Sequence, residues 1–326
     1  MKIFSKITKL AVSSLLCISI VTGSLTSCSL GDKLGGKDDG KLDIVTTIFP
    51  SYDFAKEISG DNANITMLLK SGQDSHTYEP TTQDILSIQN CDLFIYVGGE
   101  NDAWVDDILE SFDEPVTVIK MMDCVQLCDE EHIEGTDEHD HEHDHEHDHE
   151  HETDEHIWTS PKNAMAISQE ICDTLCEIDE DNKDEYKKNC ENYLSELQKL
   201  DGEIREVVES AKRDTLVFGD RFPFLYFAQE YGLNYYAAFS GCSTETEPSA
   251  KTIAFLIEKI ESEDIPAVLY IEFSAQTVAD SIAEQTGTKS LLLHSCHNVT
   301  KEEIEDGASY ISLMEGNIEV LKEALN

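Results

Sequence analysis

The chain has 326 residues and a formal net charge of −44, from 67 acidic residues against 23 basic ones. This excess of negative charge argues against nucleic acid or an anionic molecule as the ligand, and it favours cations. The length that remains after an N-terminal leader is enough for two lobes of ordinary size.

The first 27 residues have the composition of a secretory signal peptide. A basic start precedes an apolar run over residues 10–25, which is interrupted by Ser, Thr and Gly. The run ends in Leu-Thr-Ser-Cys at Cys28, which resembles the lipobox of bacterial lipoproteins. The resemblance implies cleavage before Cys28 and a lipid anchor on that cysteine. Residues 28–41 are rich in glycine and charge, so we expect a flexible tether.

Apolar runs alternate with amphipathic helical patterns over residues 42–129. The runs LDIVTTIF, NITMLLK, DLFIYV and PVTVIKM predict strands, and the segments between them predict helices. This alternation is typical of an α/β lobe with a mostly parallel sheet, whose ligands bind beyond the carboxyl ends of the strands. His76 follows the second predicted strand and so falls in such a loop.

Residues 130–155 contain a tract in which histidine alternates with aspartate and glutamate. Imidazole binds borderline divalent metals, and the carboxylates add oxygen donors and negative charge. Because the tract has almost no apolar side chains to bury, we predict a mobile loop that binds metal weakly. The alternatives are a solvated acidic run and a purification tag, although the tract is internal. The expected weak ligands are His139, His141, His143, His145, His147, His149 and His151.

The remaining sequence predicts a long helix and a second lobe. Residues 156–180 complete the first lobe with a helix that has Pro161 at its entry, and a longer helical pattern covers 181–212. At 1.5 Å per residue, about 30 residues span roughly 45 Å, which is enough to join two lobes. Residues 213–326 again alternate strands with helices. We therefore predict two α/β lobes, with mostly parallel sheets flanked by helices, joined by one long helix.

The ten cysteines are not spaced as in a small disulfide scaffold. Cys172 and Cys176 are four residues apart on a predicted helix and so face the same side. We expect buried free thiols for most of the cysteines. The pairing considered for a disulfide is Cys242 with Cys296, which lie in two loops of the second lobe.

Four further histidines lie at predicted strand ends or loop-to-helix junctions: His76, His156, His294 and His297. The segments SHTYEPTTQD, EHIWTSPKNA, FPFLYFAQEYGL and SYISLMEGNIEVLKEAL resemble the zinc and manganese solute-binding lipoproteins of ABC importers, of the zinc-uptake type with a His-rich loop. The resemblance covers nearly the whole mature chain. It implies one divalent metal ion in a cleft between the lobes, delivery to a membrane permease, and no enzymatic reaction. We expect a monomer on the extracytoplasmic face of a bacterial membrane.

The resemblance also implies metal ligands. His76 and His156 match two ligand positions of the family, and His294 matches a third, where an aspartate is usual. At the remaining position the chain has Arg221, whose guanidinium offers no lone pair. His297 is the expected replacement, and an all-histidine set favours Zn²⁺ over Mn²⁺.

Two alternatives remain open at that position. Asp220 could ligate in place of His297. Otherwise Arg221 pairs with an acid such as Glu245 or Glu247, and the ligand comes from elsewhere in the chain.

Two other functions compete with import. A secreted zinc hydrolase is disfavoured because the chain has no His-Glu-x-x-His or Gly-x-Ser-x-Gly motif, and Glu79 is the only candidate for a general base. An extracellular zinc buffer or adhesin, in which the His-rich tract alone matters, is the other alternative.

Overall fold

The computed structural model describes residues 40–73, 78–130, 135, 153–241, 243 and 247–326. All of these belong to one compact unit, Lys37–Asn326. The signal peptide, Cys28, His76 and the tract from His139 to His151 lie outside the described residues, so their roles stay predictions. Among the described residues, no helix has the length and apolar character needed to cross a bilayer.

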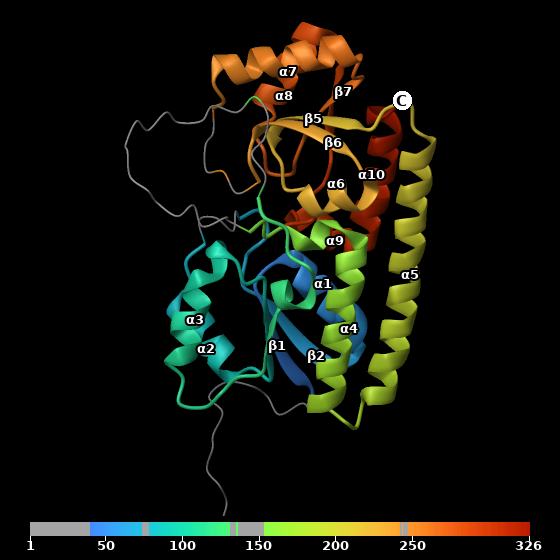
Figure 1. Cartoon of the computed structure of the whole chain (residues 1–326). Helices are drawn as coiled ribbons and strands as arrows, with labels where there is room; N and C mark the ends of the chain where they lie inside the picture. Colours follow the sequence, from blue (N-terminus) through green and yellow to red (C-terminus); the bar gives the residue numbers. More distant parts are fainter. Residues whose placement is uncertain (1–39, 74–77, 131–134, 136–152, 242, 244–246) are drawn as a thin grey trace, which may run out of the picture. The chain divides into compact units, whose positions relative to one another are not determined.

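Four parallel strands form the sheet of the N-terminal lobe, in the order β2-β1-β3-β4 (Figure 1). Their bounds are β1 Leu42–Thr46, β2 Ala63–Met67, β3 Leu93–Tyr96 and β4 Val118–Lys120. All four side chains of β3 are buried, as expected for a parallel strand that is covered on both faces. One face packs on α1 (Phe49–Ser59), and the other packs on α2 (Thr82–Asn90) and α3 (Ala103–Glu110).

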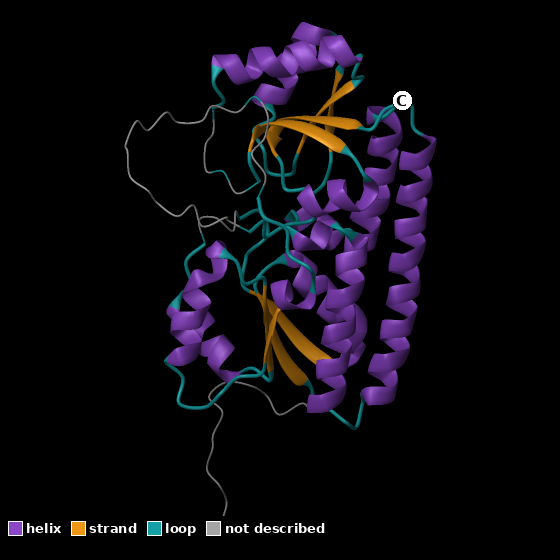
Figure 2. Cartoon of the chain, viewed as in Figure 1, coloured by secondary structure: helices purple, strands orange, loops and turns teal. Residues whose placement is uncertain are grey.

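The C-terminal lobe repeats this design with the strand order β6-β5-β7-β8, again parallel throughout. The strands are β5 Thr215–Arg221, β6 Asn234–Phe239, β7 Ala267–Tyr270 and β8 Lys289–Leu292. The helices are α6 Leu225–Tyr231, α7 Ala250–Glu263, α8 Thr277–Thr286, α9 Lys301–Glu305 and α10 Tyr310–Ala324. Figure 2 shows helices on both sides of the sheets. The prediction of two parallel α/β lobes is confirmed.

One long helix, α5 (Lys183–Ser210), connects the lobes. α4 (Pro161–Ile178) packs against α5, and α5 also contacts α1 of the first lobe and α10 of the second. With 28 residues, α5 is about 42 Å long at 1.5 Å per residue. One hydrophobic core continues from α1 through α5 to α10, and it includes Phe54 and Tyr310. The lobes are therefore joined by packed side chains as well as by chain connections.

Two features differ from the sequence predictions. The short helix α9 was not expected; it begins with a capping box, in which the Thr300 and Glu303 side chains each accept a hydrogen bond from the other's backbone N–H. The disulfide between Cys242 and Cys296 is not formed, because Cys296 carries a free, buried thiol whose Sγ lies 3.9 Å from His294 O. Cys242 lies outside the described residues.

Candidate metal site

His156 lies just before α4, and Asp154 fixes its orientation. The Asp154 carboxylate accepts a hydrogen bond from the His156 backbone N–H at 2.8 Å and lies 3.3 Å from the ring Nδ1. Both side chains are buried, with only 3% and 2% of their surfaces exposed. This contact places the ring proton on Nδ1 and the lone pair on Nε2. A carboxylate behind the ring in this way is the usual support of a zinc-binding histidine.

The charge around His156 favours a cation. Burial alone would lower the pKa of His156, but the carboxylate of Asp154, followed by those of Glu155 and Glu130, raises it above its ordinary value. The same carboxylates that stabilise a proton on this ring would stabilise a metal ion bound to it. The proton and the metal therefore compete for one site.

Two neighbours hold the segment around Asp154 in place, and a glycine leaves room for the His156 ring. The hydroxyl of Tyr226, on α6, donates a hydrogen bond to Asp154 O at 2.8 Å. The Glu155 carboxylate accepts hydrogen bonds from the backbone and side-chain amides of Asn101, at 3.1 and 2.7 Å. A Cβ atom at Gly241 would lie 3.3 Å from the His156 ring and 2.9 Å from Phe222 O, so glycine leaves the space that the ring occupies.

His297 is the histidine that the structure brings to His156. Their ring centroids are 6.1 Å apart, and the Trp158 ring contacts both, at 5.4 Å from His156 and 5.3 Å from His297. Two imidazoles bound to one tetrahedral zinc ion, each at about 2.0–2.1 Å, have centroids roughly 5 Å apart. The observed separation of the two rings is therefore about 1 Å larger than that of two ligands of one zinc ion.

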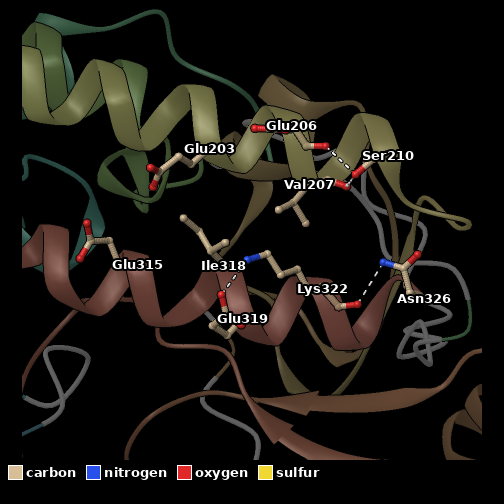
Figure 3. A pocket seen from close by; sticks show the side chains of 9 residues that line it. All are labelled: Glu203, Glu206, Val207, Ser210, Glu315, Ile318, Glu319, Lys322 and Asn326. Atoms are coloured by element: carbon tan, nitrogen blue, oxygen red, sulfur yellow. Dashed lines mark hydrogen bonds and ion pairs between the residues drawn. The ribbon is translucent and has the colours of Figure 1, made fainter.

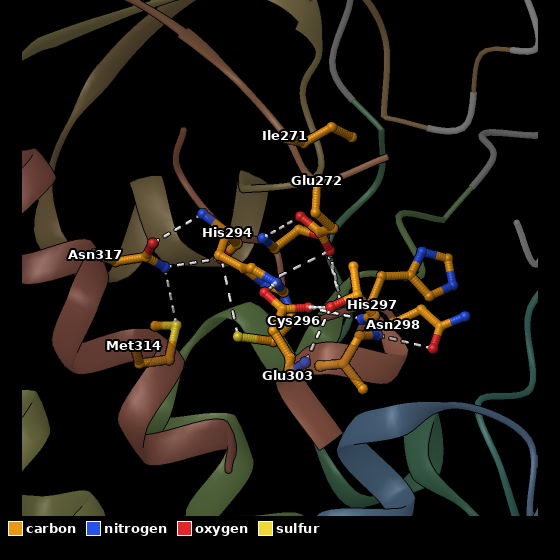
Figure 4. Close-up of polar contacts among 12 residues, drawn as sticks. Ile271, Glu272, His294, Cys296, His297, Asn298, Glu303, Met314 and Asn317 are labelled. Atoms are coloured by element: carbon orange, nitrogen blue, oxygen red, sulfur yellow. Dashed lines mark hydrogen bonds and ion pairs between the residues drawn. The ribbon is translucent and has the colours of Figure 1, made fainter. Parts of the chain in front are cut away.

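Glu272, two residues beyond the end of β7, anchors the segment that carries His297. Its carboxylate accepts hydrogen bonds from Ser295 N at 2.7 Å, Ser295 Oγ at 2.6 Å and His297 N at 3.1 Å. Trp158 adds a bond from the other lobe, because its Nε1–H donates to Ser295 O at 2.9 Å. Figure 4 shows Glu272 above this segment, with the His297 ring pointing away from His294.

His294 is also buried, but its ring nitrogens have different neighbours from those of His156. Its Nδ1 accepts a hydrogen bond from Cys296 N–H at 2.9 Å, so the ring proton of the neutral form lies on Nε2. That Nε2 has no hydrogen-bond partner among the described residues and lies 3.6 Å from a carboxylate oxygen of Glu303. Either ring nitrogen could bind a metal only if the bond from Cys296 were broken. His294 is thus less prepared to act as a ligand than His156.

Asp220 and Arg221 end strand β5. Asp220 is 8% exposed. Its two carboxylate oxygens accept backbone hydrogen bonds from Arg221 N at 2.8 Å and Ile271 N at 3.1 Å, and the second of these ties β5 to the end of β7. Both oxygens therefore bind backbone N–H groups at the ends of β5 and β7. This geometry favours His297 over Asp220 as the replacement ligand.

The structure thus brings together His156 and His297, and leaves His294 turned toward other partners. Within the described part of the chain, no group of three or more His, Cys, Asp or Glu side chains is arranged to hold a metal ion. Asp154 and Glu272 were not predicted from the sequence. Asp154 fell within the predicted mobile loop, although the residue is buried and lies two positions before His156. A carboxylate at this spacing from a candidate ligand was the available signal.

Two pockets lie elsewhere in the compact unit. One, of about 500 Å³, lies between α5 and α10 and is lined mainly by acidic side chains, Lys322 and Asn326 (Figure 3). The other, of about 360 Å³, is lined by residues that include Lys70, Tyr78 and Glu79. Among the described residues, no histidine lines either pocket.

Comparison with known proteins identifies similar chains. A family model described as "ZnuA: Zinc-uptake complex component A periplasmic" matches residues 44–324. The zinc-binding lipoprotein AdcA of Streptococcus pneumoniae (strain ATCC BAA-255 / R6) is 35% identical over 312 residues, which make up 95% of this chain and 60% of AdcA. The high-affinity zinc uptake system protein ZnuA of Bacillus subtilis (strain 168) is 33% identical over 307 residues, 92% of this chain and 93% of that protein.

Two solved structures share the fold. The Zn(II)-bound ZnuA-like domain of S. pneumoniae AdcA aligns with a TM-score of 0.72 at 32% identity, covering 88% of this chain and 99% of that domain. The metal-dependent lipoprotein YcdH from B. subtilis aligns with a TM-score of 0.74 at 30% identity, covering 87% of this chain and 99% of that one. The chain spans about 60% of the length of the AdcA protein that it matches.

Proposed function

This chain belongs to the ZnuA family of zinc-uptake complex components, and we propose that it captures Zn²⁺ outside the cytoplasm and passes it to an ABC-type permease. The chemistry is binding and release, without a reaction. Anchoring through an acylated Cys28 at the extracytoplasmic face of a bacterial membrane, and a monomeric state, are parts of this proposal. The names of the relatives support it, since AdcA is called a zinc-binding lipoprotein and ZnuA a high-affinity zinc uptake protein.

One observation carries the proposal: a buried histidine, His156, is oriented by a carboxylate and lies beside His297. We assign these two rings and His76 as ligands of a single Zn²⁺, on nitrogen donors that suit zinc better than manganese. His294 is the fourth candidate, and it joins only if its hydrogen bond from Cys296 is released. We propose that the histidines from His139 to His151 bind zinc weakly before it reaches this site.

Proton competition sets the direction of the pH dependence. A ligand imidazole must lose its ring proton from the metal-binding nitrogen, and the pKa of His156 is raised by its carboxylate neighbours. Zinc affinity should therefore decrease as the pH falls through that raised pKa. At higher pH the same carboxylates favour the metal.

Metal titration of single variants tests the site. His156→Ala is expected to remove the tight zinc ion, whereas His143→Ala, in the His-rich tract, should keep it and reduce only weak binding. The measurement is isothermal titration of metal-free protein, with bound metal quantified by mass spectrometry. Retention of the tight ion by His156→Ala would refute the assignment.

The competing functions predict other results. A manganese carrier would be purified with Mn²⁺ from cells grown with both metals. A zinc buffer or adhesin would lose its metal capacity when residues 137–152 are deleted, and a strain lacking the gene would still grow in zinc-limited medium. A hydrolase would keep an exchangeable water on its metal and cleave a substrate.

A further inference from the structure

A buried amide joins the two lobes next to His297. Asn298 is 1% exposed. Its Nδ2 donates hydrogen bonds to two backbone carbonyls of the N-terminal lobe, Lys70 O at 2.8 Å and Gln73 O at 2.9 Å. Its Oδ1 accepts from Val299 N–H at 2.8 Å. Both protons and the oxygen of this one side chain are therefore used.

The partner of Asn298 is a tight turn that follows β2. Gln73 N donates to Lys70 O at 3.0 Å, and Lys70 N donates to Gln73 Oε1 at 3.1 Å, so the turn is closed by its own bonds. Gly72, inside the turn, has φ of +78°, a conformation that favours glycine. Ser71 adds a second link between the lobes, because its Oγ donates to Val299 O at 2.7 Å.

The bonds from Asn298 and Ser71 form a latch between the lobes, and its residues are close in sequence to two of the ligands assigned above. Asn298 directly follows His297, and His76 is three residues beyond Gln73 in the sequence. Figure 4 shows the Asn298 and His297 side chains extending in the same direction, away from His294. We propose that Asn298 is a positioning residue for the metal site, which fixes the turn before His76 against His297 and slows the release of zinc. This inference rests on the proposed function.

The chemistry of an amide explains the choice of residue. Two carbonyls need two donors, which aspartate lacks, and Val299 N–H needs an acceptor, which lysine and arginine lack. Leucine would remove the bonds to Gln73 O and from Val299 N–H, and it would remove one of the two hydrogen bonds that Lys70 O accepts. Substitution of a residue that supports metal ligands costs roughly 10- to 100-fold in metal affinity. Because opening the lobes must break the two bonds from Asn298, we expect the loss to appear in the dissociation rate.

The test measures zinc release from the full chain into excess chelator by stopped flow. Asn298→Ala is expected to release zinc at least about tenfold faster than the unsubstituted protein. The matched control is Asn189→Ala, which removes a comparable bond, from Asn189 Nδ2 to Ile58 O at 3.1 Å, between α5 and α1. It should lower the melting temperature and leave the release rate within about twofold. The absorption spectrum of bound Co²⁺ should change in Asn298→Ala only.

Several outcomes would overturn the inference. The first is a folded Asn298→Ala protein that releases zinc at the rate of the unsubstituted protein. The second is an equal increase of the release rate in Asn189→Ala, which would indicate a general loss of stability. If Asn298→Ala does not fold, Ser71→Ala decides, with an expected acceleration of about threefold or, against the inference, none. If His156→Ala also keeps the tight zinc ion, the proposed function is refuted. If His156→Ala loses this ion but the Asn298 and Ser71 variants release zinc at the normal rate, only the inference about Asn298 is refuted.

Discussion

Two buried histidines, His156 and His294, show how the partner of one ring nitrogen prepares the other for a metal. Each ring is almost fully buried. Behind His156 Nδ1 lies the carboxylate of Asp154, at 3.3 Å. Behind His294 Nδ1 lies a backbone N–H, that of Cys296, at 2.9 Å, while the nearest carboxylate oxygen, from Glu272, is farther away at 3.7 Å.

The difference decides the tautomer. A carboxylate accepts, so His156 keeps its proton on Nδ1 and presents a lone pair at Nε2. A backbone N–H donates, so neutral His294 carries its proton on Nε2 and has no lone pair to offer there. Burial and residue type are the same in both cases. What surrounds the ring, and not the histidine itself, distinguishes a prepared ligand from an unprepared one.

The most severe test compares the two histidines of one segment, His294 and His297. Replacement of His297 by alanine should lower zinc affinity by more than the roughly 100-fold upper range for loss of a supporting residue. Replacement of His294 should cost no more than about 10- to 100-fold, because its contribution requires the bond from Cys296 to break. Competition with a chromophoric chelator measures both constants. Equal losses would show that this bond does break when zinc binds.

A milder change alters the carboxylate that orients His156 and leaves the imidazole ring in place. Asp154→Asn keeps an oxygen that can accept from Nδ1–H but removes the charge, so the pKa of His156 should fall and zinc affinity should drop about tenfold. The pH profile of zinc binding separates this from misfolding, since its midpoint should move to lower pH. Glu155→Gln serves as the control, because Glu155 bonds to Asn101 and ranks behind Asp154 among the carboxylates that raise the pKa of His156. A larger loss in the control would contradict this explanation.

The fold was largely predictable because it depends on patterns that repeat locally. Strands such as Leu93–Tyr96 are continuous apolar runs, and helices such as α7 begin at a clear cap, with Ser249 Oγ accepting from Thr252 N at 3.0 Å. The short helix α9 was missed because five residues are too few for a periodic pattern. Its cap, Thr300 with Glu303, was visible in the sequence but not interpreted.

The site was predictable in its residue types and not in its geometry. The motifs around His156 and the pair of histidines in LLLHSCHN identified candidates. Which of them face each other depends on Glu272 and Trp158, whose hydrogen bonds to the Ser295–His297 segment join residues more than 20 positions apart or in different lobes. Sequence spacing contains no information on such contacts.

The weakest effect on zinc is expected at a buried carboxylate that has no imidazole beside it. Asp53, on α1, accepts a hydrogen bond from Tyr310 N at 2.8 Å, at the start of α10. Burial raises the pKa of Asp53 from 3.8 to about 7, against the lowering effect of this hydrogen bond. Between these two values the folded protein holds a proton that the unfolded chain has lost. The free energy of unfolding should therefore fall as pH rises, by at most about 1.4 kcal/mol per pH unit from this group.

Asp53→Asn removes the titration while keeping an oxygen for Tyr310 N–H. The variant should gain stability over the unsubstituted, metal-free protein as the pH rises from about 4 to about 7, measured by urea unfolding, and should bind zinc within about twofold of normal. Asp306→Asn, at an exposed site, is the control and should not change the slope. Parallel profiles for Asp53→Asn and the unsubstituted protein would show that Asp53 stays charged when folded. In that case the hydrogen bond from Tyr310 N, at the start of α10, offsets the cost of burying the charge.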